Sequence, residues 1–292
     1  MNVFLQAFAK VNYALEVQGM RDDGYHEVST VMQSISLADK VEIQRIREGF
    51  ELSVEPEYAE VGPPEENTVH KARRLLGDFV RTDLPVKVHL RKRIPAGAGL
   101  GGGSADAAAA LVGLNELFEL GLSEAKLQRI GLQVGADVPF CIRGGTALGE
   151  GIGEILTSLP VPPRHYLVIA KPASGVQTDQ IYRAYDQSPN GDKASVYRVV
   201  RALRAGDLAA LSLGLGNDLQ PVTERLIPEI RGLEERLLAA GALGAAMSGS
   251  GTAVYGIFGS ETETQAAVKG LLTPFLIGVY EPMTHGVEII HQ

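Results

Sequence analysis

The stretch "PAGAGLGGGSADAAAA", residues 95–110, constrains the fold of this 292-residue chain more than any other segment. Five of the seven residues from 97 to 103 are glycines, and an alanine-rich segment follows directly. Glycine in ordered structure carries an entropic cost, so this density predicts either a flexible linker or a backbone that must approach something closely. A linker would join independent units and be rich in serine and polar residues, which this stretch is not.

The segments on either side of the glycines have clear periodicity. "LPVKVHLRKRIP" alternates Val86, Val88 and Leu90, which predicts a strand that stops at Pro95. "SADAAAALVGLNELFEL" combines strong helix formers with apolar spacing, and Gly121 marks the end of that helix. A strand, a glycine loop and a helix in this order present backbone N–H groups and the positive end of a helix dipole to an anion. We therefore predict a phosphate-binding loop, with a tight structural turn as the alternative.

Two familiar phosphate-binding loops fit the stretch poorly. Gly97, Gly99 and Gly102 match G-x-G-x-x-G, which would indicate a dinucleotide-binding oxidoreductase. That fold needs a second strand ending in Asp or Glu about 20 residues later, where this sequence has the helical segment "LVGLNELFEL". The Walker loop needs a lysine directly before its serine or threonine, and none precedes Ser104.

The rest of the chain predicts an α+β protein with two lobes. Strands dominate the first 55 residues or so, a turn at "RDDGYH" joins the first two, and a helix capped by Asn67 or Thr68 follows. "VPFCIRGGTALGEG" is expected to be loop and strand, and the prolines of "LTSLPVPPRHY" place a boundary between lobes 1–158 and 159–292. In the second lobe we expect strands at "YLVIAKP", "TAVYGIF" and "HGVEIIH", and helices near 178–187, 193–205, 220–240 and 260–274.

Composition excludes several classes of protein. The formal net charge of −8 argues against nucleic-acid binding, which usually needs a basic protein. No apolar run approaches the ~20 residues that span a bilayer, and no basic region precedes an apolar stretch at the N-terminus, so neither membrane association nor a signal peptide is expected. The single cysteine, Cys141, excludes an internal disulfide and a cysteine-rich metal site. We expect a cytoplasmic protein that acts on a small molecule, as a monomer or weak homodimer.

Three motifs carry a resemblance to a known family. "IPAGAGLGGGSADAAAAL" resembles the central P-x-x-x-G-L-G-S/G-S-S/A motif of the GHMP kinase superfamily of small-molecule kinases. "AFAKVNYALEV" near the N-terminus and "GAAMSGSGTAVYGIF" near the C-terminus resemble the other two family motifs, in the right order. The resemblance covers essentially the whole chain. It implies a two-lobed GHMP kinase fold, with a ribosomal S5 domain 2-like N-terminal lobe and a ferredoxin-like C-terminal lobe.

Further segments narrow the resemblance. "GYHEVSTVMQSISLAD", the triple glycine of "GLGGGSADA" and "GADVPFCIRGGTALGEGIGE" are similar to the branch that phosphorylates the 2-hydroxyl of a diphosphocytidyl methylerythritol in non-mevalonate isoprenoid synthesis. The resemblance then implies ATP as the phosphoryl donor, Mg²⁺ as cofactor and a small cytidine diphosphate substrate. The alternatives are another GHMP kinase, such as a mevalonate or homoserine kinase, and a non-catalytic nucleotide sensor on the same fold.

The resemblance assigns the chemistry to two side chains. Asp137 in "GADVPF" matches the family's general base, which takes the proton of the acceptor hydroxyl; on its own, a loop Asp is usually a turn former. Lys10 is a lone cation in the apolar strand "AFAKVNYAL", and its family role is to pair with the Asp and stabilise the transferring phosphate. Asn12 lies two residues on, on the same strand face, where it can hydrogen-bond the same end of the substrate. Retention of Lys10 and Asp137 argues against a non-catalytic sensor.

The candidate substrate-binding residues lie in two distant segments. Tyr25 and His26 match the pair that in the family stacks on the cytosine and hydrogen-bonds its edge, although "DDGYHE" would also suit a plain hairpin turn. Tyr182 is expected to complete the sandwich from the second lobe, with Thr178 on the same side.

The candidate ATP-binding residues centre on the glycine stretch. Ser104 is placed to meet a phosphate or Mg²⁺ or to cap the helix, Asn67 and Lys92 are candidates for the adenine end, and the metal ligands stay open. The "SGSG" turn at 248–251 is expected to pack near the phosphate loop or to serve only as a helix-to-strand turn. The predicted residues of the stretch are Pro95, Ala96, Gly97, Ala98, Gly99, Leu100, Gly101, Gly102, Gly103, Ser104 and Ala105.

Overall fold

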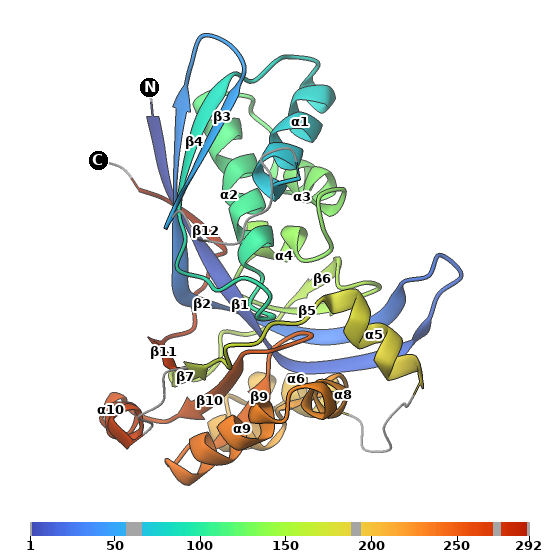
Figure 1. Ribbon diagram of the computed structural model, residues 1–292, viewed down its shortest axis with the longest axis vertical. Helices are drawn as coiled ribbons and strands as arrows, with labels where there is room; N and C mark the ends of the chain where they lie inside the picture. Colours follow the sequence, from blue (N-terminus) through green and yellow to red (C-terminus); the bar gives the residue numbers. More distant parts are fainter. Residues whose placement is uncertain (1, 57–65, 188–193, 271–275, 291–292) are drawn as a thin grey trace.

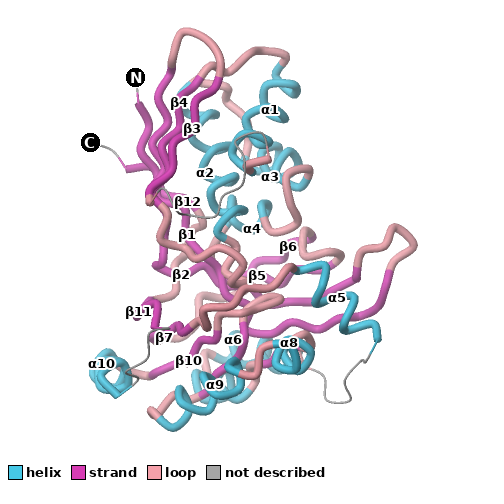
Figure 2. Tube along the Cα trace, in the orientation of Figure 1, coloured by secondary structure: helices cyan, strands magenta, loops and turns pink. Residues whose placement is uncertain are grey.

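The computed structural model describes residues 2–56, 66–187, 194–270 and 276–290 of the chain. Within these ranges it contains a larger sheet of eight strands and a smaller sheet of four. Figure 1 shows the helices before residue 150 beside the larger sheet and most helices after residue 195 beside the smaller one. Figure 2 shows the same two groups by secondary structure. The predicted α+β class is confirmed.

Two long strands dominate the larger sheet. β1 (Asn2–Met20) and β2 (His26–Arg45) pair antiparallel over most of their length. Both faces of β1 are buried in its middle, and its last residues become exposed, because the end of the hairpin extends beyond the sheet core (Figure 1). The predicted turn at "RDDGYH" is confirmed: the Asp23 carboxylate accepts a hydrogen bond from the Tyr25 amide at 3.2 Å.

The remaining strands of the larger sheet come from distant parts of the chain. Its main path has the order β12-β1-β2-β4-β3, with β5 paired to β2 and β6, and β8 paired to β1. The bounds of these strands are β3 Phe50–Glu55, β4 Val86–Arg91, β5 Thr146–Glu150, β6 Ile155–Ser158, β8 Gly216–Asn217 and β12 Val287–Ile290. The strand at "HGVEIIH" was expected to complete the second lobe, and that expectation is wrong: β12 pairs with Phe4–Ala7 of β1. The lobe boundary at 158/159 stays a prediction.

A group of helices lies on one side of the larger sheet (Figure 1). They are α1 (Thr68–Val80), α2 (Gly102–Leu117), α3 (Glu124–Leu132) and α4 (Val138–Arg143). The alanines explain how closely α2 approaches the sheet: Ala107 to Ala110 are fully buried, and a Cβ on Gly113 would lie 2.7 Å from Ile43 Cδ1. The predicted cap of α1 is confirmed, since the Asn67 side chain accepts from the Val69 amide.

Helix α4 corrects the expectation of loop and strand at "VPFCIRGG". Pro139 lies in the first turn of α4, where a proline needs no N–H partner and its fixed φ suits a helix. The helix has only six residues, too few for a helical period to show in the sequence. The strand part of the expectation holds, because β5 follows at Thr146.

The smaller sheet is antiparallel, in the order β11-β7-β10-β9. The predicted strands β7 and β10 are confirmed, whereas β9 and β11 were not predicted. A single helix over 220–240 is wrong: the residue before Pro228 leaves the helical region, which splits the segment into two helices. The predicted residues 193 and 271–274 lie outside the described residues. The bounds are β7 Tyr166–Ala170, β9 Gly244–Met247, β10 Val254–Phe258, β11 Leu276–Tyr280, α5 Thr178–Gln187, α6 Val196–Ala205, α7 Leu208–Leu213, α8 Gln220–Leu226, α9 Glu229–Ala239 and α10 Glu261–Gly270.

The two sheets meet where β1 passes β10. The Tyr255 hydroxyl of β10 donates to the Asn12 carbonyl of β1 at 2.8 Å, and the Tyr13 hydroxyl contacts Nε2 of His165 at 3.0 Å. Burial raises the pKa of both tyrosines, so both stay neutral donors. Asn12 is thereby fixed relative to both sheets. In the described ranges, no helix is long and apolar enough to cross a membrane.

Candidate active site

The predicted site residues converge on one cleft of about 1020 Å³. The cleft is lined by β1, the tip of the β1–β2 hairpin, the glycine loop, α5, and the loops that carry Asp137 and Gly249. All predicted site residues line it except Ala105. Ala105 is buried in α2 and its amide donates to the Gly101 carbonyl at 2.8 Å, so it is used by the helix itself.

The glycine loop ends in a left-handed residue that starts α2. Gly101 has φ 72° and precedes the first helical residue, so the helix begins at Gly102, two residues earlier than the sequence pattern suggested. The amides of residues 102–104 come before the first intrahelical hydrogen bond and have no acceptor within the helix. They therefore lie at the positive end of the helix dipole and on the wall of the cleft.

The glycine loop packs directly against the turn at 248–251, as predicted. The Ser248 hydroxyl donates to the Gly99 carbonyl at 2.9 Å, and the Ala253 amide donates to the Ala98 carbonyl at 3.0 Å. Gly99 has φ 73°, and a Cβ there would lie 2.0 Å from the Ser248 carbonyl oxygen. Gly99 is therefore required for the packing between these two loops, whether or not a ligand also needs it.

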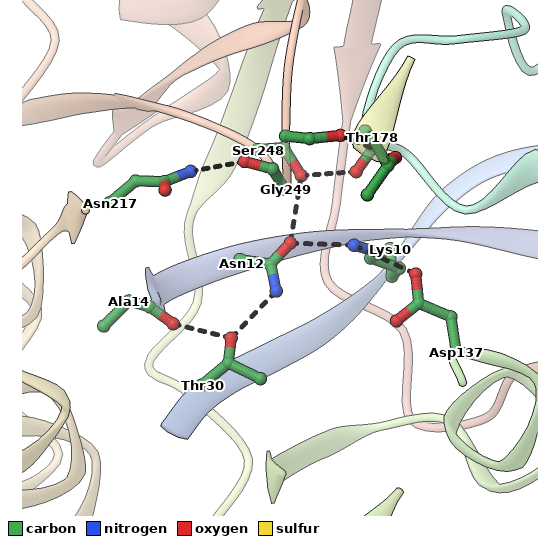
Figure 3. Close-up of polar contacts among 11 residues, drawn as sticks. Lys10, Asn12, Ala14, Thr30, Asp137, Thr178, Asn217, Ser248 and Gly249 are labelled. Carbon is green, nitrogen blue, oxygen red and sulfur yellow. Dashed lines mark hydrogen bonds and ion pairs between the residues drawn. The ribbon is translucent and has the colours of Figure 1, made fainter. Parts of the chain in front are cut away.

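Lys10 lies between Asn12 and Asp137, as Figure 3 shows. Its Nζ atom is 2.8 Å from Asn12 Oδ1 and 3.3 Å from Asp137 Oδ2. The Lys10 side chain is 5% exposed, and a Cβ on Gly101 would lie 3.1 Å from Lys10 Cγ. The ammonium thus reaches the cleft along the glycine loop, and Gly101 leaves the space that its methylene groups occupy.

The orientation of Asn12 is fixed by a chain of hydrogen bonds (Figure 3). Its Nδ2 donates to the Thr30 hydroxyl at 2.8 Å, and that hydroxyl donates to the Ala14 carbonyl at 2.7 Å. The Thr30 hydroxyl is therefore an acceptor toward Asn12, and the amide oxygen of Asn12 must face Lys10. The sequence analysis missed Thr30, because it is one of several polar residues in this strand and nothing in the sequence distinguishes it.

A second missed residue holds the 248–251 turn. Asn217 Nδ2 donates to the carbonyls of Met247 at 2.9 Å and Gly249 at 2.7 Å, and the Asn217 side chain is buried. Because Gly249 lines the cleft beside Lys10 Nζ, Asn217 stabilises one wall of the site without entering it. Its sequence context gave no motif that would single it out.

Lys92 lines the cleft, but its ammonium is already paired with two buried carboxylates. Nζ contacts Asp39 and Asp106, and Asp39 also accepts the Ile94 amide at 2.9 Å. Burial raises the pKa of Asp106 to about 7. The Lys92 charge opposes this rise, and the Asp39 charge adds to it. Burial would lower the pKa of Lys92, but the two carboxylates raise it above its ordinary value. Neither carboxylate was predicted.

The predicted base-binding residues lie at the hairpin tip and on α5. Tyr25 is 60% exposed. His26 stacks on Tyr182, with ring centroids 4.6 Å apart and planes at 29°, and Nε2 of His26 lies 2.7 Å from Asp186 Oδ1. Burial raises the pKa of Tyr182, and the Asp137 charge adds to the effect. The Thr178 hydroxyl hydrogen-bonds Ser250 at 2.9 Å. The structure thus brings Tyr182 to His26, while a base between Tyr25 and Tyr182 stays a prediction.

The described residues hold no cluster of three or more His, Cys, Asp or Glu side chains with metal-site geometry. A catalytic Mg²⁺ does not need one, because it usually keeps several waters and binds one or two protein oxygens plus the substrate phosphates. A Cβ on Gly135 would lie 3.9 Å from the Ser104 hydroxyl, so this hydroxyl faces the loop that carries Asp137. The oxygens present fit a Mg²⁺ ion bound together with a nucleotide.

Comparisons with known proteins agree with the motifs. The sequence matches the family descriptions "GHMP kinases N terminal domain" over residues 67–145 and "GHMP kinases C terminal" over 199–273. A Moorella thermoacetica protein named 4-diphosphocytidyl-2-C-methyl-D-erythritol kinase is 48% identical, over 87% of this chain and 89% of that protein. A Pelotomaculum thermopropionicum protein of the same name is 46% identical, over 90% and 92%.

Solved structures agree as well. A crystal structure of 4-(cytidine 5'-diphospho)-2C-methyl-D-erythritol kinase has a TM-score of 0.80 and 32% identity, covering 98% of this chain and 100% of that one. A homoserine kinase from Cytophaga hutchinsonii has a TM-score of 0.79 at 22% identity, covering 99% and 97%, and shows the fold alone. The chain belongs to the GHMP kinases, in the family of the 4-diphosphocytidyl-2-C-methyl-D-erythritol kinases.

Proposed function

We propose that this protein transfers the γ-phosphoryl group of ATP, with Mg²⁺, to the 2-hydroxyl of 4-diphosphocytidyl-2-C-methyl-D-erythritol. The single observation that carries the proposal is the Lys10–Asp137 pair, 3.3 Å apart, beside the start of the glycine-loop helix. The names of relatives that share nearly half of this sequence support the same substrate.

Phosphoryl transfer asks a protein mainly for positioning and charge stabilisation. The amides of 102–104 at the start of α2 would hold phosphate oxygens, because they have no acceptor in the helix. Mg²⁺, held by the Ser104 hydroxyl together with the phosphates, would neutralise negative charge on the triphosphate. The rest of the site would then act on the acceptor hydroxyl.

Asp137 is proposed to accept the proton of the acceptor hydroxyl. Its side chain is 35% exposed on the cleft, so a substrate can reach it. Lys10 would stabilise both the ionised carboxylate and the charge on the transferring group. An ammonium has three donors, and Asn12 takes one at 2.8 Å, which leaves capacity for a phosphate oxygen beside Asp137.

The base end of the substrate would lie at the opposite side of the cleft. The hairpin tip and α5 line that side, with Tyr25, His26 and Tyr182. Aromatic faces suit a nucleobase by stacking, and a ring nitrogen can read its edge. Mevalonate and homoserine carry no nucleobase that these aromatic side chains could bind, so a mevalonate or homoserine kinase is disfavoured.

A coupled assay of ADP release tests the proposal. The purified protein is offered ATP and Mg²⁺ with 4-diphosphocytidyl-2-C-methyl-D-erythritol, mevalonate or homoserine in turn. We expect turnover with the cytidyl substrate alone. Turnover that favours mevalonate or homoserine, or none with the cytidyl compound, would overturn it. A cytoplasmic location and a monomer or weak homodimer stay predictions, and light scattering of the purified protein tests the latter.

A further inference from the structure

Thr30 of β2 is a buried hydroxyl in the wall of the cleft, beside the strand that carries Lys10. A hydroxyl taken out of water costs free energy unless its hydrogen bonds are made inside the protein. Thr30 makes two, one to the Ala14 carbonyl at 2.7 Å and one to Asn12 Nδ2 at 2.8 Å (Figure 3). The hydroxyl therefore connects the backbone of β1 with a side chain of the same strand.

The two bonds of Thr30 have a fixed direction. A hydroxyl has a single proton, and a carbonyl can only accept, so that proton lies between Thr30 and Ala14. The Thr30 oxygen then offers Asn12 only a lone pair, which attracts an N–H and repels an oxygen. The Asn12 amide must therefore direct Nδ2 to Thr30 and Oδ1 to Lys10. A backbone carbonyl thus decides, through Thr30, which end of the amide faces the ammonium.

The consequence reaches the reacting end of the cleft through Lys10. Its ammonium has three N–H donors, and within the described ranges it contacts Asn12 Oδ1 at 2.8 Å and Asp137 Oδ2 at 3.3 Å. If the Asn12 amide were reversed, a donor would face a donor, and the ammonium would lose an acceptor in a place where the Lys10 side chain is only 5% exposed. The ammonium would then shift toward Asp137 and away from the position that serves the transferring phosphate.

We propose that Thr30 is a positioning residue for phosphoryl transfer, whose hydroxyl orients the Asn12 amide and thereby holds the Lys10 ammonium in place. The inference rests on the proposed function, because it takes the reaction at Lys10 from it. Thr30 need not touch the substrate. The competing role is packing: Thr30 Cγ2 lies 3.3 Å from the place of a Cβ on Gly149, so the methyl group fills space between β2 and β5.

Two substitutions at Thr30 separate these roles. Thr30→Val keeps the shape of the side chain and replaces the hydroxyl by a methyl group, whereas Thr30→Ser keeps the hydroxyl and removes the methyl group. For Thr30→Val we expect kcat to fall by about tenfold or more while the KM for ATP changes less than about twofold, because a hydrogen bond to a charged group is misplaced at the reacting end only. Thr30→Ser should restore most of the turnover. A packing role predicts the reverse order of the two variants.

Thr264→Val in α10 is the matched control. The Thr264 hydroxyl is also buried and donates to the Ser260 carbonyl at 2.7 Å, but it does not line the cleft. This variant loses a comparable hydrogen bond, so it should share a decrease in thermal stability and keep the kcat of the wild type.

A double-mutant cycle shows whether Thr30 acts through Asn12. In an Asn12→Ala background there is no amide to orient, so we expect Thr30→Val to lower the residual kcat by less than about twofold. An equal loss in both backgrounds would overturn the proposal, because Thr30 would then act by another route.

NMR of the side-chain amides tests the same contact without any substrate. The Asn12 signals are those that disappear in Asn12→Ala, and hydrogen exchange with water reports whether their protons are bonded. We expect slow exchange in the wild type, Thr30→Ser and Thr264→Val, and exchange about tenfold faster or more in Thr30→Val. Rapid exchange of both Asn12 protons in the wild type overturns the proposal, even if the valine variant fails to fold.

Two kinetic results also overturn the proposal: a normal kcat in Thr30→Val, and a loss in Thr30→Ser as large as in Thr30→Val. Absence of turnover with the cytidyl substrate in the wild type would instead refute the proposed function. The amide exchange would still test the bond between Thr30 and Asn12.

Discussion

Lys10 and Asp137 approach to 3.3 Å from two separate elements, one from the middle of β1 and the other from the residue before α4. Their exposure differs: the lysine side chain is 5% exposed and the aspartate 35%. The cation is therefore enclosed by protein while its partner is open to a substrate hydroxyl. An enclosed cation raises the strength of its electrostatic interactions, because less water screens it.

Replacement of Asp137 by asparagine tests the general base. The amide keeps the shape of the side chain but cannot take a proton, so we expect turnover to fall by ~10²-fold or more. ATP affinity should be nearly unchanged, because the phosphates are held from the glycine loop. ADP release and calorimetric titration with ATP measure the two effects, with Asp78→Asn on the exposed face of α1 as the control. Near-normal turnover would remove Asp137 from the mechanism.

Gly103→Ala tests phosphate binding by the start of α2. A Cβ at Gly103 would meet nothing closer than Thr68 at 3.7 Å, whereas at Gly102 it would lie 2.9 Å from Ile94, and Gly101 has φ 72°. Gly103 can thus change without strain, and alanine in a helix gains up to ~1 kcal/mol over glycine. We expect unimpaired thermal stability but a higher KM for ATP, because a methyl group enters the space for phosphate.

The matched control for Gly103→Ala is Gly232→Ala in α9, where a Cβ meets nothing within 4 Å. If alanine in a helix raises the melting temperature of Gly103→Ala, it should raise that of Gly232→Ala in the same way. Gly232→Ala should leave the KM for ATP unchanged. If Gly103→Ala also binds ATP normally, the glycines of the first turn serve packing rather than phosphate.

Tyr25→Ala tests the stacking of the base. Stacking on an aromatic ring is worth ~1–3 kcal/mol per base, so we expect the KM for the cytidyl substrate to rise by about 5- to 150-fold. The ratio between cytidyl and uridyl substrates should stay the same, because a ring face does not read donors and acceptors. Tyr197→Ala, which removes a comparably exposed tyrosine on α6 outside the cleft, is the control. A loss of selectivity in Tyr25→Ala would contradict pure stacking.

Asp106 predicts a pH dependence of stability. Its pKa is raised from 3.8 to about 7 by burial, so the folded protein holds this proton more tightly than the unfolded chain. The stability it contributes is fully present below about pH 4 and is lost as the pH rises through about 7. Urea unfolding should therefore show the stability of the wild type falling relative to Asp106→Asn between pH 5 and pH 8.

Asp78→Asn, an exposed substitution on α1, is the control for this measurement and should give a difference that does not change over the same pH range. A wild type that becomes more stable relative to Asp106→Asn as the pH rises would show that burial does not dominate at this carboxyl.

The sequence predicted those parts of the fold whose evidence is local. β4 and α2 were found because alternation and helical spacing are visible within a dozen residues, and the Asn67 cap because it follows a short rule. The family resemblance, now confirmed by the comparisons, supplied Lys10 and Asp137 as a pair. No local pattern relates two residues so far apart in the chain.

The sequence could not show which residues far apart in the chain contact each other in the fold. Lys92 meets Asp39 and Asp106 only because β2, the loop after β4 and α2 pack together. The pattern at "HGVEIIH" correctly indicated a strand but not the sheet that it joins. From the sequence alone, Asp186 is an acidic residue on an amphipathic helix with no visible partner. Its contact with His26 depends on the packing of the hairpin tip against α5.

The pairing of β12 with β1 sets an order of events during protein synthesis. β1 carries Lys10, and it leaves the ribosome long before the strand that covers its outer edge, residues 287–290. Gly286 also lies so close to the α4 backbone that a Cβ there would be 1.9 Å from the Cys141 carbonyl oxygen, just beyond Asp137. The outer edge of β1 therefore stays unpaired during synthesis until residues 286–290 have emerged, and only then can the chain complete the packing around Lys10 and α4.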